Sequence, residues 1–245
     1  MVIKKIFLFS VLCLFSISVF SQNNNLNFGE KPEIKKVIAR VFNNDRMELI
    51  DTISKKYHNI EFLIITSKLN QNQDDIGNEL NNISIIELLR TENNRNWVLN
   101  SYAENIEKDF GEYNTIESIQ IHDLWDNEYL LSLDYHYDNG RDKIITEQHF
   151  YLKNKKVLSL TTSYSRLEIN NNAKNEDDVY SKGAEFGRTF KIDNQKKQIV
   201  VTYKGTRAYN EQLNKYMPVN KTEIYKLGLN NKKELAFLLT KSYNN

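Results

Sequence analysis

The sequence predicts an α+β fold in which N-terminal amphipathic helices pack on a curved, mainly antiparallel sheet. Apolar residues recur with helical spacing before residue 115 and alternate with polar residues after it. The chain has 245 residues, 40% of them hydrophobic and 27% charged, a balance typical of a globular protein with a substantial core. No Pro-, Gly- or Ser-rich linker divides it, so we expect one α+β domain over residues 32–245.

A signal peptide is predicted over residues 1–21. Lys4 and Lys5 form a basic start, an apolar run of 15 residues follows, and Val19 and Ser21 supply the small residues of a cleavage site. The run is shorter than the roughly 20 residues that span a bilayer. We therefore expect an exported protein, periplasmic or extracellular, with no transmembrane segment after cleavage.

Cleavage before Gln22 would leave residues 22–31 as a polar, flexible arm. Acylation at Cys13 is an alternative, but Leu12 is bulkier than the small residue expected before a lipidated cysteine. Cys13 is the only cysteine in the chain, so the mature protein would have none. This excludes disulfides, thiolate nucleophiles and Cys-ligated metal sites.

The mature chain would carry a net charge of −1, which by itself favours neither nucleic acid nor an anionic membrane as a partner. Asn, Lys, Ile and Tyr are abundant, as an AT-rich genome produces. A leader ending in Phe-Ser-Gln-Asn on such a composition resembles exported proteins of Bacteroidota. This resemblance covers the leader and the composition only, and it points to no family.

The N-terminal part of the domain predicts helices. An apolar stripe with spacing i, i+3, i+4, i+7, i+8 comprises Ile34, Val37, Ile38, Val41 and Phe42. Asp45 and Glu48 resemble a capping box before a second short helix, although a strand over Met47–Ile53 is also compatible with the pattern. Phe62–Thr66 predicts a buried strand.

Two further helices are expected before residue 115. Ser84 and Glu87 are placed to cap a short one. The other covers Trp97–Phe110, where large residues recur every four positions and Gly111 follows as a C-terminal signal.

Alternation predicts strands from Thr115 onward. They cover Ile116–His122, Glu128–Asp138, Ile144–Leu152, Val157–Ser165, Thr189–Ile192, Gln198–Tyr203, Thr222–Leu227 and Glu234–Leu239. Asn139-Gly140 favours a two-residue hairpin turn, which would pair residues whose numbers sum to 279. His149 would then lie opposite Leu130, about 20 Å from His136 along the ladder, too far for a shared metal.

The segment 146–158 faintly echoes the segment 222–235, since both contain Thr-Glu, Tyr and Asn-Lys-Lys in order. The spacing of these shared residues differs by one residue between the two segments. We attribute the echo to the Asn- and Lys-rich composition rather than to a duplication, which would keep a fixed period.

Familiar catalytic and cofactor motifs are missing from the sequence. It contains no G-x-S-x-G, G-x-x-x-x-G-K, H-E-x-x-H or G-x-G-x-x-G pattern. We therefore predict no catalytic residue, no resident metal and no cofactor.

The densest polar cluster surrounds Trp125 between two predicted strands. It consists of His122, Asp123, Asp126 and Glu128. Three carboxylates suit a hard cation, and a carboxyl–imidazole pair suits acid–base chemistry. The spacing does not match an EF-hand, however, and one such cluster is expected by chance at this charge content, so we favour a polar turn that places Trp125 over the sheet edge. We carry His122, Asp123, Trp125, Asp126 and Glu128 forward as ligand-binding candidates.

Lysine pairs recur along the chain, and Tyr203, Tyr209 and Tyr216 lie among basic residues. Basic groups beside aromatic rings can bind polyanions or stack on sugars and bases. Lysines near turns also protect sheet edges from aggregation, and the slightly negative mature charge favours this structural role.

Three functions follow as hypotheses. The first is an exported, non-enzymatic binding or interaction module with a protein, glycan or lipid partner in the cell envelope. The second is a periplasmic carrier that encloses an apolar ligand, and the third is a glycan hydrolase using paired carboxylates. Nucleic acid is not an expected partner.

Overall fold

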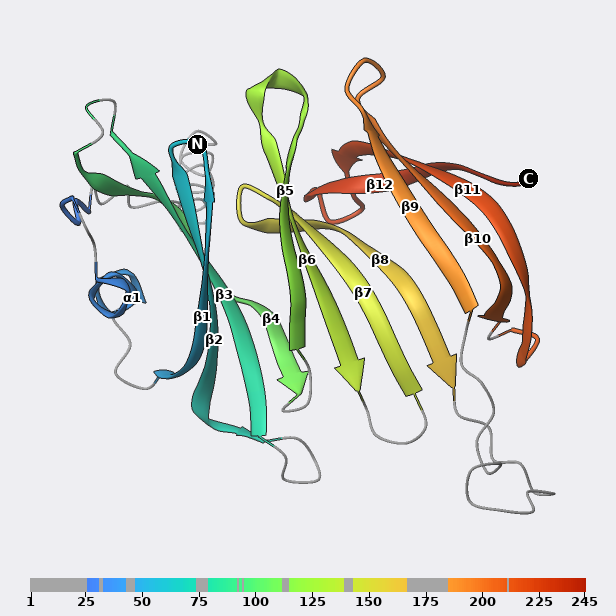
Figure 1. Cartoon of the computed structure of the whole chain (residues 1–245), viewed down its shortest axis with the longest axis horizontal. Coiled ribbons are helices and arrows are strands. Elements are labelled where there is room, and N and C mark those ends of the chain that lie inside the picture. Colours follow the sequence, from blue (N-terminus) through green and yellow to red (C-terminus); the bar gives the residue numbers. More distant parts are fainter. Residues whose placement is uncertain are drawn as a thin grey trace, which may run out of the picture.

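The computed structural model describes residues 26–30, 33–42, 47–73, 79–91, 93, 95–111, 115–138, 143–166, 185–210 and 212–245. Within these ranges the chain forms one short α-helix, a three-residue 3₁₀ helix (Trp125–Asn127) and three four-stranded antiparallel sheets (Figure 1). The leader prediction lies outside the described residues, as does half of the predicted arm.

Each sheet is a meander of consecutive strands. Helix α1 (Ile34–Phe42) precedes sheet 1, which contains β1 (Met47–Tyr57), β2 (Ile60–Gln73), β3 (Glu79–Arg90) and β4 (Trp97–Gly111). Sheet 2 contains β5 (Thr115–Asp123), β6 (Tyr129–Asp138), β7 (Lys143–Leu152) and β8 (Lys155–Arg166). Sheet 3 contains β9 (Glu185–Asp193), β10 (Gln198–Asn210), β11 (Lys215–Leu229) and β12 (Leu235–Asn244).

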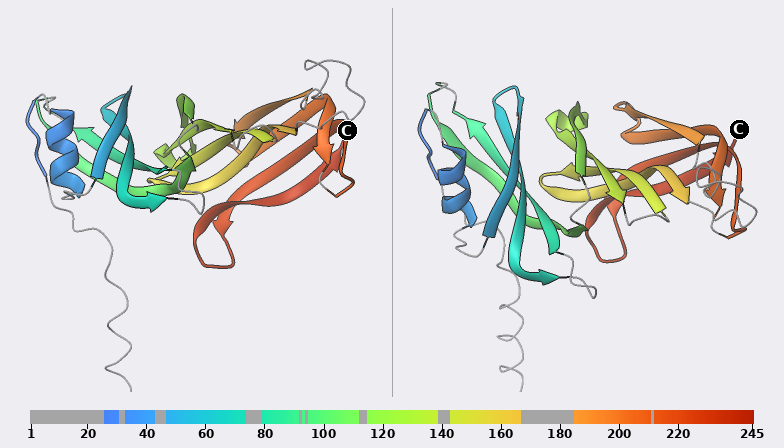
Figure 2. Two further views of the ribbon diagram at one scale, coloured as in Figure 1. Left: turned by 90° about the horizontal axis from the view of Figure 1, so that it is seen from below. Right: turned by 60° about the horizontal axis from the view of Figure 1, so that its bottom comes forward.

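The sheets stand in a row, face to face, in chain order, as Figures 1 and 2 show from three directions. One apolar cluster joins sheets 1 and 2 and includes Phe62, Ile85, Leu133 and Tyr135. A second joins sheets 2 and 3 and includes Leu130, Phe150, Ile199 and Val201. The middle sheet is therefore buried on both faces.

The alternation of side chains along a strand explains how sheet 1 packs against sheet 2 on one face and against α1 on the other. Successive side chains of a strand point to opposite faces. Phe62 and Ile64 accordingly pack toward sheet 2, whereas Leu63 and Ile65 pack against α1. This is why the run Phe62–Ile65 is continuously apolar, as in other strands that are buried on both sides.

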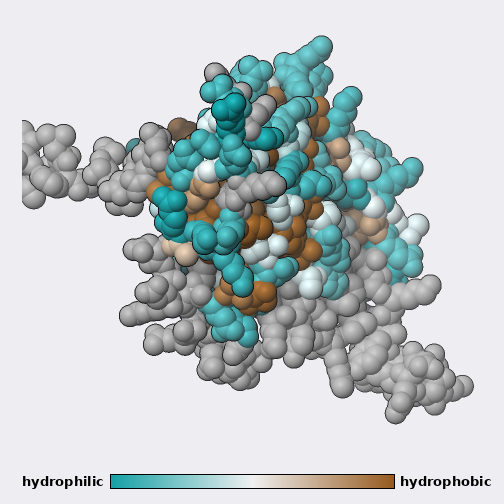
Figure 3. All heavy atoms as spheres, turned by 60° about the vertical axis from the view of Figure 1, so that its left-hand side comes forward, coloured by the Kyte–Doolittle hydropathy of each residue, from teal (hydrophilic) through white to brown (hydrophobic). Residues whose placement is uncertain are grey.

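Helix α1 covers part of the outer face of sheet 1. Its buried residues are Val37, Ile38 and Phe42, and the ring of Phe42 meets the edge of Tyr102 on β4 at 5.9 Å between centroids. Figure 3 views the molecule from this end and shows hydrophobic residues lying between hydrophilic ones on that face.

The predicted α+β class is wrong, because the described chain is mostly β. The predicted first helix is α1, and the eight strands predicted after Thr115 correspond one to one to β5–β12, with Glu128 and Glu234 each one residue outside the strand. The other N-terminal helices are strands, however: Met47–Ile53 lies in β1, Ser84–Leu89 in β3 and Trp97–Phe110 in β4. The curved single sheet is in fact three sheets.

Trp97–Phe110 shows why the helix prediction failed. Residues four positions apart lie on the same face of a strand, whose side chains repeat every two residues, and also on nearly the same face of a helix, which turns every 3.6 residues. Register shifts in the β3–β4 ladder and a positive φ of 51° at Asn105 then change which face the side chains occupy. As a result Tyr102 contacts α1 while Ile106 packs toward sheet 2.

The predicted register of β6 and β7 is also wrong. The ladder pairs Leu133 with His149 and Leu131 with Tyr151, so partner numbers sum to 282 instead of 279. The described strands end at Asp138 and resume at Lys143, and the predicted Asn139-Gly140 turn lies outside the described residues. An odd shift exchanges the faces of a strand, and His149 therefore points toward sheet 1 while Phe150 packs toward sheet 3.

The two echoing segments occupy matching places in the fold. Residues 146–158 run from β7 through a turn into β8, and residues 222–235 run from β11 through a turn into β12. Both are hairpins of the third and fourth strands of a sheet. In both, the Glu contacts the side chain two positions on, since Glu147 pairs with His149 and Glu223 accepts a hydrogen bond from Tyr225.

Candidate functional site

The five candidates around Trp125 lie at the end of β5 and in the short turn that follows, but their side chains diverge. The His122 imidazole lies 3.1 Å from Ser132 Oγ and meets Phe190 of β9 edge-on. Asp123 accepts a hydrogen bond from the Tyr57 hydroxyl of β1. Neither side chain points to a site shared with the other.

The remaining three candidates contact other elements. Trp125 packs edge-on against Phe237 of β12, Asp126 pairs with Lys197 at 2.7 Å, and Glu128 pairs with Lys153 at 2.6 Å. Asp123 at the end of β5 thus contacts sheet 1, Trp125 and Asp126 contact sheet 3, and Glu128 pairs within sheet 2. Ligand binding by these residues stays a prediction, and the contacts account for their polarity without a ligand.

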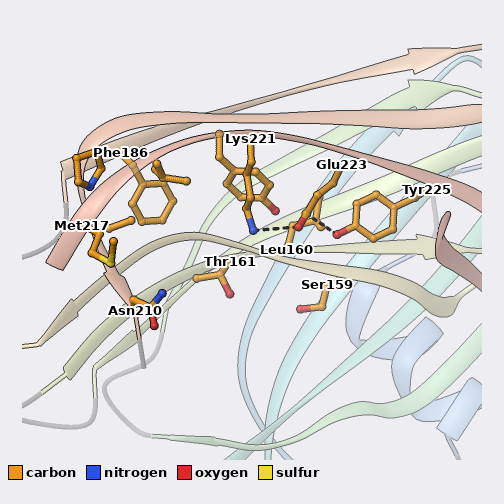
Figure 4. Close-up of a pocket in the computed structure, with 13 residues that line it drawn as sticks. Ser159, Leu160, Thr161, Phe186, Asn210, Met217, Lys221, Glu223 and Tyr225 are labelled. Atoms are coloured by element: carbon orange, nitrogen blue, oxygen red, sulfur yellow. Dashed lines mark hydrogen bonds and ion pairs between the residues drawn. The ribbon is translucent and has the colours of Figure 1, made fainter. Parts of the chain in front are cut away.

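A groove of about 600 Å³ lies between the edge strand β8 and the inner face of sheet 3 (Figure 4). We call it the β8 groove. It is lined by Ser159, Leu160, Thr161, Phe186, Tyr203, Ala208, Asn210, Met217, Pro218, Val219, Lys221, Glu223 and Tyr225. Its volume is in the range of small-molecule sites.

Arg188 of β9 holds the two walls of this groove together. Its guanidinium donates to the Leu160 carbonyl of β8 at 2.9 Å and to Gln148 Oε1 of β7 at 2.6 Å. Burial lowers the pKa of Arg188, and a guanidinium nevertheless stays protonated at neutral pH. Sheet 3 is therefore tied to sheet 2 by a charged group that also satisfies a carbonyl of the edge strand.

Alternation along β11 places a polar line in the groove. Lys221, Glu223 and Tyr225 are two residues apart and so share one face. Glu223 accepts a hydrogen bond from Lys221 at 2.9 Å and from the Tyr225 hydroxyl at 2.7 Å. The Lys221 ammonium also lies 4.7 Å from the centre of the Tyr203 ring. Figure 4 shows the three side chains in sequence, with both contacts to Glu223 dashed.

These contacts keep Glu223 ionised. Burial alone would raise the pKa of Glu223, but the hydrogen bonds from Lys221 and Tyr225 outweigh it, and the pKa is lowered. Burial, with the neighbouring carboxylate, raises the pKa of both Tyr203 and Tyr225. At neutral pH the groove thus presents an ammonium, a carboxylate and two neutral phenols.

The other end of the groove is apolar. Phe186 and Met217 lie together there in Figure 4, next to Pro218. Pro218 has no ladder partner because the β10–β11 register shifts between Gly205 and Ala208. Proline is accepted in strands at such irregularities, since it cannot donate to a ladder.

The sequence held only indirect signals for this site. Tyr203 lies among basic residues in the sequence, and Glu223 and Tyr225 belong to the segment 222–235, which resembles the segment 146–158. Nothing in the pattern indicated that β8 would lie against them, because that contact joins two different sheets. Tyr216, another tyrosine of the basic set, instead carries the Arg207 guanidinium over its ring at 4.1 Å.

A second cluster of titratable groups lies between sheets 1 and 2. Glu107 of β4 accepts hydrogen bonds from His149 Nδ1 at 2.9 Å, Tyr151 at 2.7 Å and Lys156 at 3.0 Å. His149 Nε2 lies 2.8 Å from Glu147, and the hydroxyls of Tyr135 and Tyr151 are 2.9 Å apart. We call this the Glu107 cluster. Its polar groups are engaged with one another, which favours a structural role.

The Glu107 cluster shifts the pKa of its members in opposite directions. Burial opposes charge on Glu107 and His149, but their mutual hydrogen bond and their other partners outweigh it. The pKa of Glu107 falls from 4.5 to about 2, and the pKa of His149 is raised above 6.5. The hydrogen bond from His149 lowers the pKa of Glu147.

We therefore predict that His149 makes stability depend on pH. A raised folded-state pKa stabilises fully below the unfolded value of 6.5, and the contribution is lost as the pH rises through the folded value. The free-energy difference between wild type and His149→Asn should thus be largest at pH 5–6 and shrink toward pH 9. Urea unfolding of both proteins across this range measures it, and a constant difference would contradict the prediction.

Within the described residues, no group of three or more His, Cys, Asp and Glu side chains is arranged to hold a metal ion. None of the described helices is long and apolar enough to cross a membrane. The chain matches no protein-family model, no curated protein and no solved structure.

Proposed function

We propose that the protein is an exported, non-enzymatic binding module that holds a neutral oligosaccharide in the β8 groove. The observation that carries the proposal is the polar line Lys221–Glu223–Tyr225 beside aromatic and apolar walls in one open groove. Binding sites typically combine apolar lining with a few oriented polar groups. The export rests on the leader pattern of residues 1–21.

The ion pair in the groove favours a hydroxylated ligand over an apolar one. A lipid chain lying on Lys221 and Glu223 would remove water from both charges without replacing their hydrogen bonds, which is costly. Sugar hydroxyls both donate and accept, so they can replace that water. The aliphatic and aromatic surfaces of Phe186, Tyr203 and Met217 suit the C–H faces of a sugar ring.

The groove supports binding better than hydrolysis. A glycosidase pairs a protonated carboxyl group with a second carboxylate. Glu223 is the only carboxylate among the described lining residues, and its lowered pKa keeps it from acting as the acid near neutral pH. Its chemistry is that of a charged hydrogen-bond acceptor.

Calorimetric titration with soluble neutral oligosaccharides of glucose, xylose, mannose and N-acetylglucosamine tests the proposal. We expect at least one series to bind, and we expect Glu223→Gln to weaken it about tenfold, because a charge-assisted hydrogen bond contributes about 1.5–3 kcal/mol. Glu234→Gln is the matched control. It removes the same charge from the exposed turn after β11, outside the groove, and should bind as wild type does.

Two results would overturn the proposal. One is binding of an oligosaccharide that Glu223→Gln and Glu234→Gln affect equally, which would place the ligand elsewhere. The other is tight binding of palmitate with no binding of any saccharide, which would favour the apolar carrier instead.

A further inference from the structure

The net charge of the chain is near zero, but positive and negative residues are unevenly distributed along it. Residues 185–245, which form sheet 3, contain twelve Lys and Arg against five Asp and Glu. Residues 22–184 contain 19 Lys and Arg against 27 Asp and Glu. Sheet 3 therefore has a net charge of +7 at one end of the row of sheets, and such asymmetry is typical of proteins that bind a polyanion.

The outer face of sheet 3 carries much of this charge. The inner face is defined by Val201 and Phe190 of the cluster with sheet 2, so the residues adjacent to them point outward. One outward row across the four strands is Lys191–Val200–Ile224–Lys241, and the next is Asp193–Gln198–Lys226–Leu238. Lys191 and Lys241 lie on the two edge strands, about 14 Å apart at the usual strand spacing.

A row of hydroxyls follows on the same face. Thr189, Thr202 and Thr222 are direct partners across β9, β10 and β11, and Tyr243 of β12 completes the row. Thr222 is buried, and its hydroxyl accepts a hydrogen bond from Asn245 at 2.9 Å. The outward row beyond them contains Lys204. The outer face thus combines lysine rows with a row of threonines, and we call it the lysine face.

A shallow groove of about 420 Å³ lies on the lysine face. It is lined by Lys196, Gln198, Ile224, Lys226, Thr240 and Lys241, with no carboxylate among these six residues. Lys196 lies 3.7 Å from Asp193. All three lysines are exposed, and their ammonium groups would attract an anionic group into the groove.

We propose that the lysine face binds an acidic polysaccharide, with a carboxylate of the polymer held in the groove between Lys226 and Lys241. Its lysine rows match an extended chain of spaced negative charges. The hydroxyls of Thr189, which is exposed, and Thr202, which is half-buried, offer hydrogen bonds to the sugar hydroxyls between those charges. This surface is on the opposite side of sheet 3 from the β8 groove and does not depend on it.

The arrangement favours a polysaccharide over a membrane or a nucleic acid. A membrane-binding surface places a broad area of exposed apolar side chains beside the basic ones. The lysine rows contain one exposed leucine, Leu238 at 37%. The more exposed Leu229 and Leu239 belong to inward rows paired with Leu235 and Tyr225. Binding of single-stranded nucleic acid uses rows of aromatic rings for stacking. Among the described residues, the lysine face carries one exposed aromatic ring, that of Tyr243 beside Thr222, rather than a row of rings.

Affinity electrophoresis in gels containing polygalacturonate tests the proposal. We expect wild type to be retarded, with retardation falling as salt is added because the contacts are ionic. Lys226→Gln/Lys241→Gln should weaken binding at least tenfold. The matched control, Lys35→Gln/Lys55→Gln, removes two exposed lysines from α1 and β1 and should change binding less than twofold.

Three outcomes would overturn the proposal: no retardation of wild type, equal losses in the two double variants, or equal binding of dextran, which is uncharged. Anionic phosphatidylglycerol vesicles and single-stranded DNA serve as competitors. If either competitor displaces polygalacturonate while supplying fewer negative charges than the polysaccharide does, the lysine face would be assigned to that competitor instead.

Discussion

Glu107→Gln is expected to lower the free energy of unfolding by about 3 kcal/mol. The substitution keeps the shape of the side chain but removes the charge that His149, Tyr151 and Lys156 share. The pKa of Glu107 falls from 4.5 to about 2 on folding, and each pKa unit corresponds to about 1.4 kcal/mol. Breaking a buried ion pair from one side typically costs 3–5 kcal/mol.

Urea unfolding at pH 7, followed by circular dichroism, measures this effect. Glu117→Gln on β5 is the control, because its carboxylate is 52% exposed and lies 3.7 Å from His136. An exposed pair of this kind contributes less than about 1 kcal/mol. Equal unfolding midpoints for the two variants would show that the Glu107 cluster does not hold sheets 1 and 2 together.

The Glu107 contribution should also disappear in acid. A lowered folded-state pKa stabilises fully above the unfolded value of 4.5, and this is lost as the pH falls toward 2. The difference between wild type and Glu107→Gln should therefore shrink between pH 4.5 and pH 2. A difference that persists at pH 2 would mean that the glutamine acts through packing rather than charge.

Gly205→Ala is expected to destabilise sheet 3 by about 3 kcal/mol. A Cβ at this position would lie 2.3 Å from the Glu185 carbonyl oxygen and 2.4 Å from the Phe186 Cα. Both are backbone atoms of β9 and cannot rotate away, so the strands must separate. Overpacking of this kind costs about 1–3 kcal/mol, and contact with a paired backbone places the effect at the upper end.

Gly187→Ala provides a close control on the neighbouring strand. The Cβ there would meet nothing nearer than the Lys204 carbonyl oxygen at 3.9 Å, so we expect a change within about 0.5 kcal/mol. Hydrogen exchange of the β9 and β10 amides should report faster opening in Gly205→Ala alone. Since Phe186 lines the β8 groove, this variant should also bind oligosaccharide more weakly. Unchanged exchange in both variants would contradict the expected separation.

The strands after Thr115 could be predicted because local patterns define them. Alternation over Gln198–Tyr203 and Thr222–Leu227 has one interpretation, and each segment lies in a strand. Val98 to Phe110 was ambiguous, because a four-residue spacing fits both periods. The strand is stabilised by its ladder with β3 and by the packing of α1 and sheet 2 against its two faces. The preference of a segment for a strand depends on such contacts more than its preference for a helix does.

The candidate site shows the same division. The sequence placed His122, Asp123, Asp126 and Glu128 close together, but proximity along the chain did not bring their side chains to one point. The β8 groove joins residues of β8 to residues of β11 that are some 60 positions away. No local sequence pattern predicts contact between residues so far apart along the chain, since that contact depends on how one sheet packs against the next.

By itself, the sequence determined the first helix, the strands of the second half, the leader pattern and the charge of each segment. Only the tertiary structure decided that the N-terminal segments are strands, that β6 pairs with β7 three residues away from the expected register, and which lysines share a face. The physical reason is that a strand is stabilised by partners distant in sequence. Its faces acquire different surroundings only once the sheets are stacked, so the two grooves of sheet 3 exist only in the assembled fold.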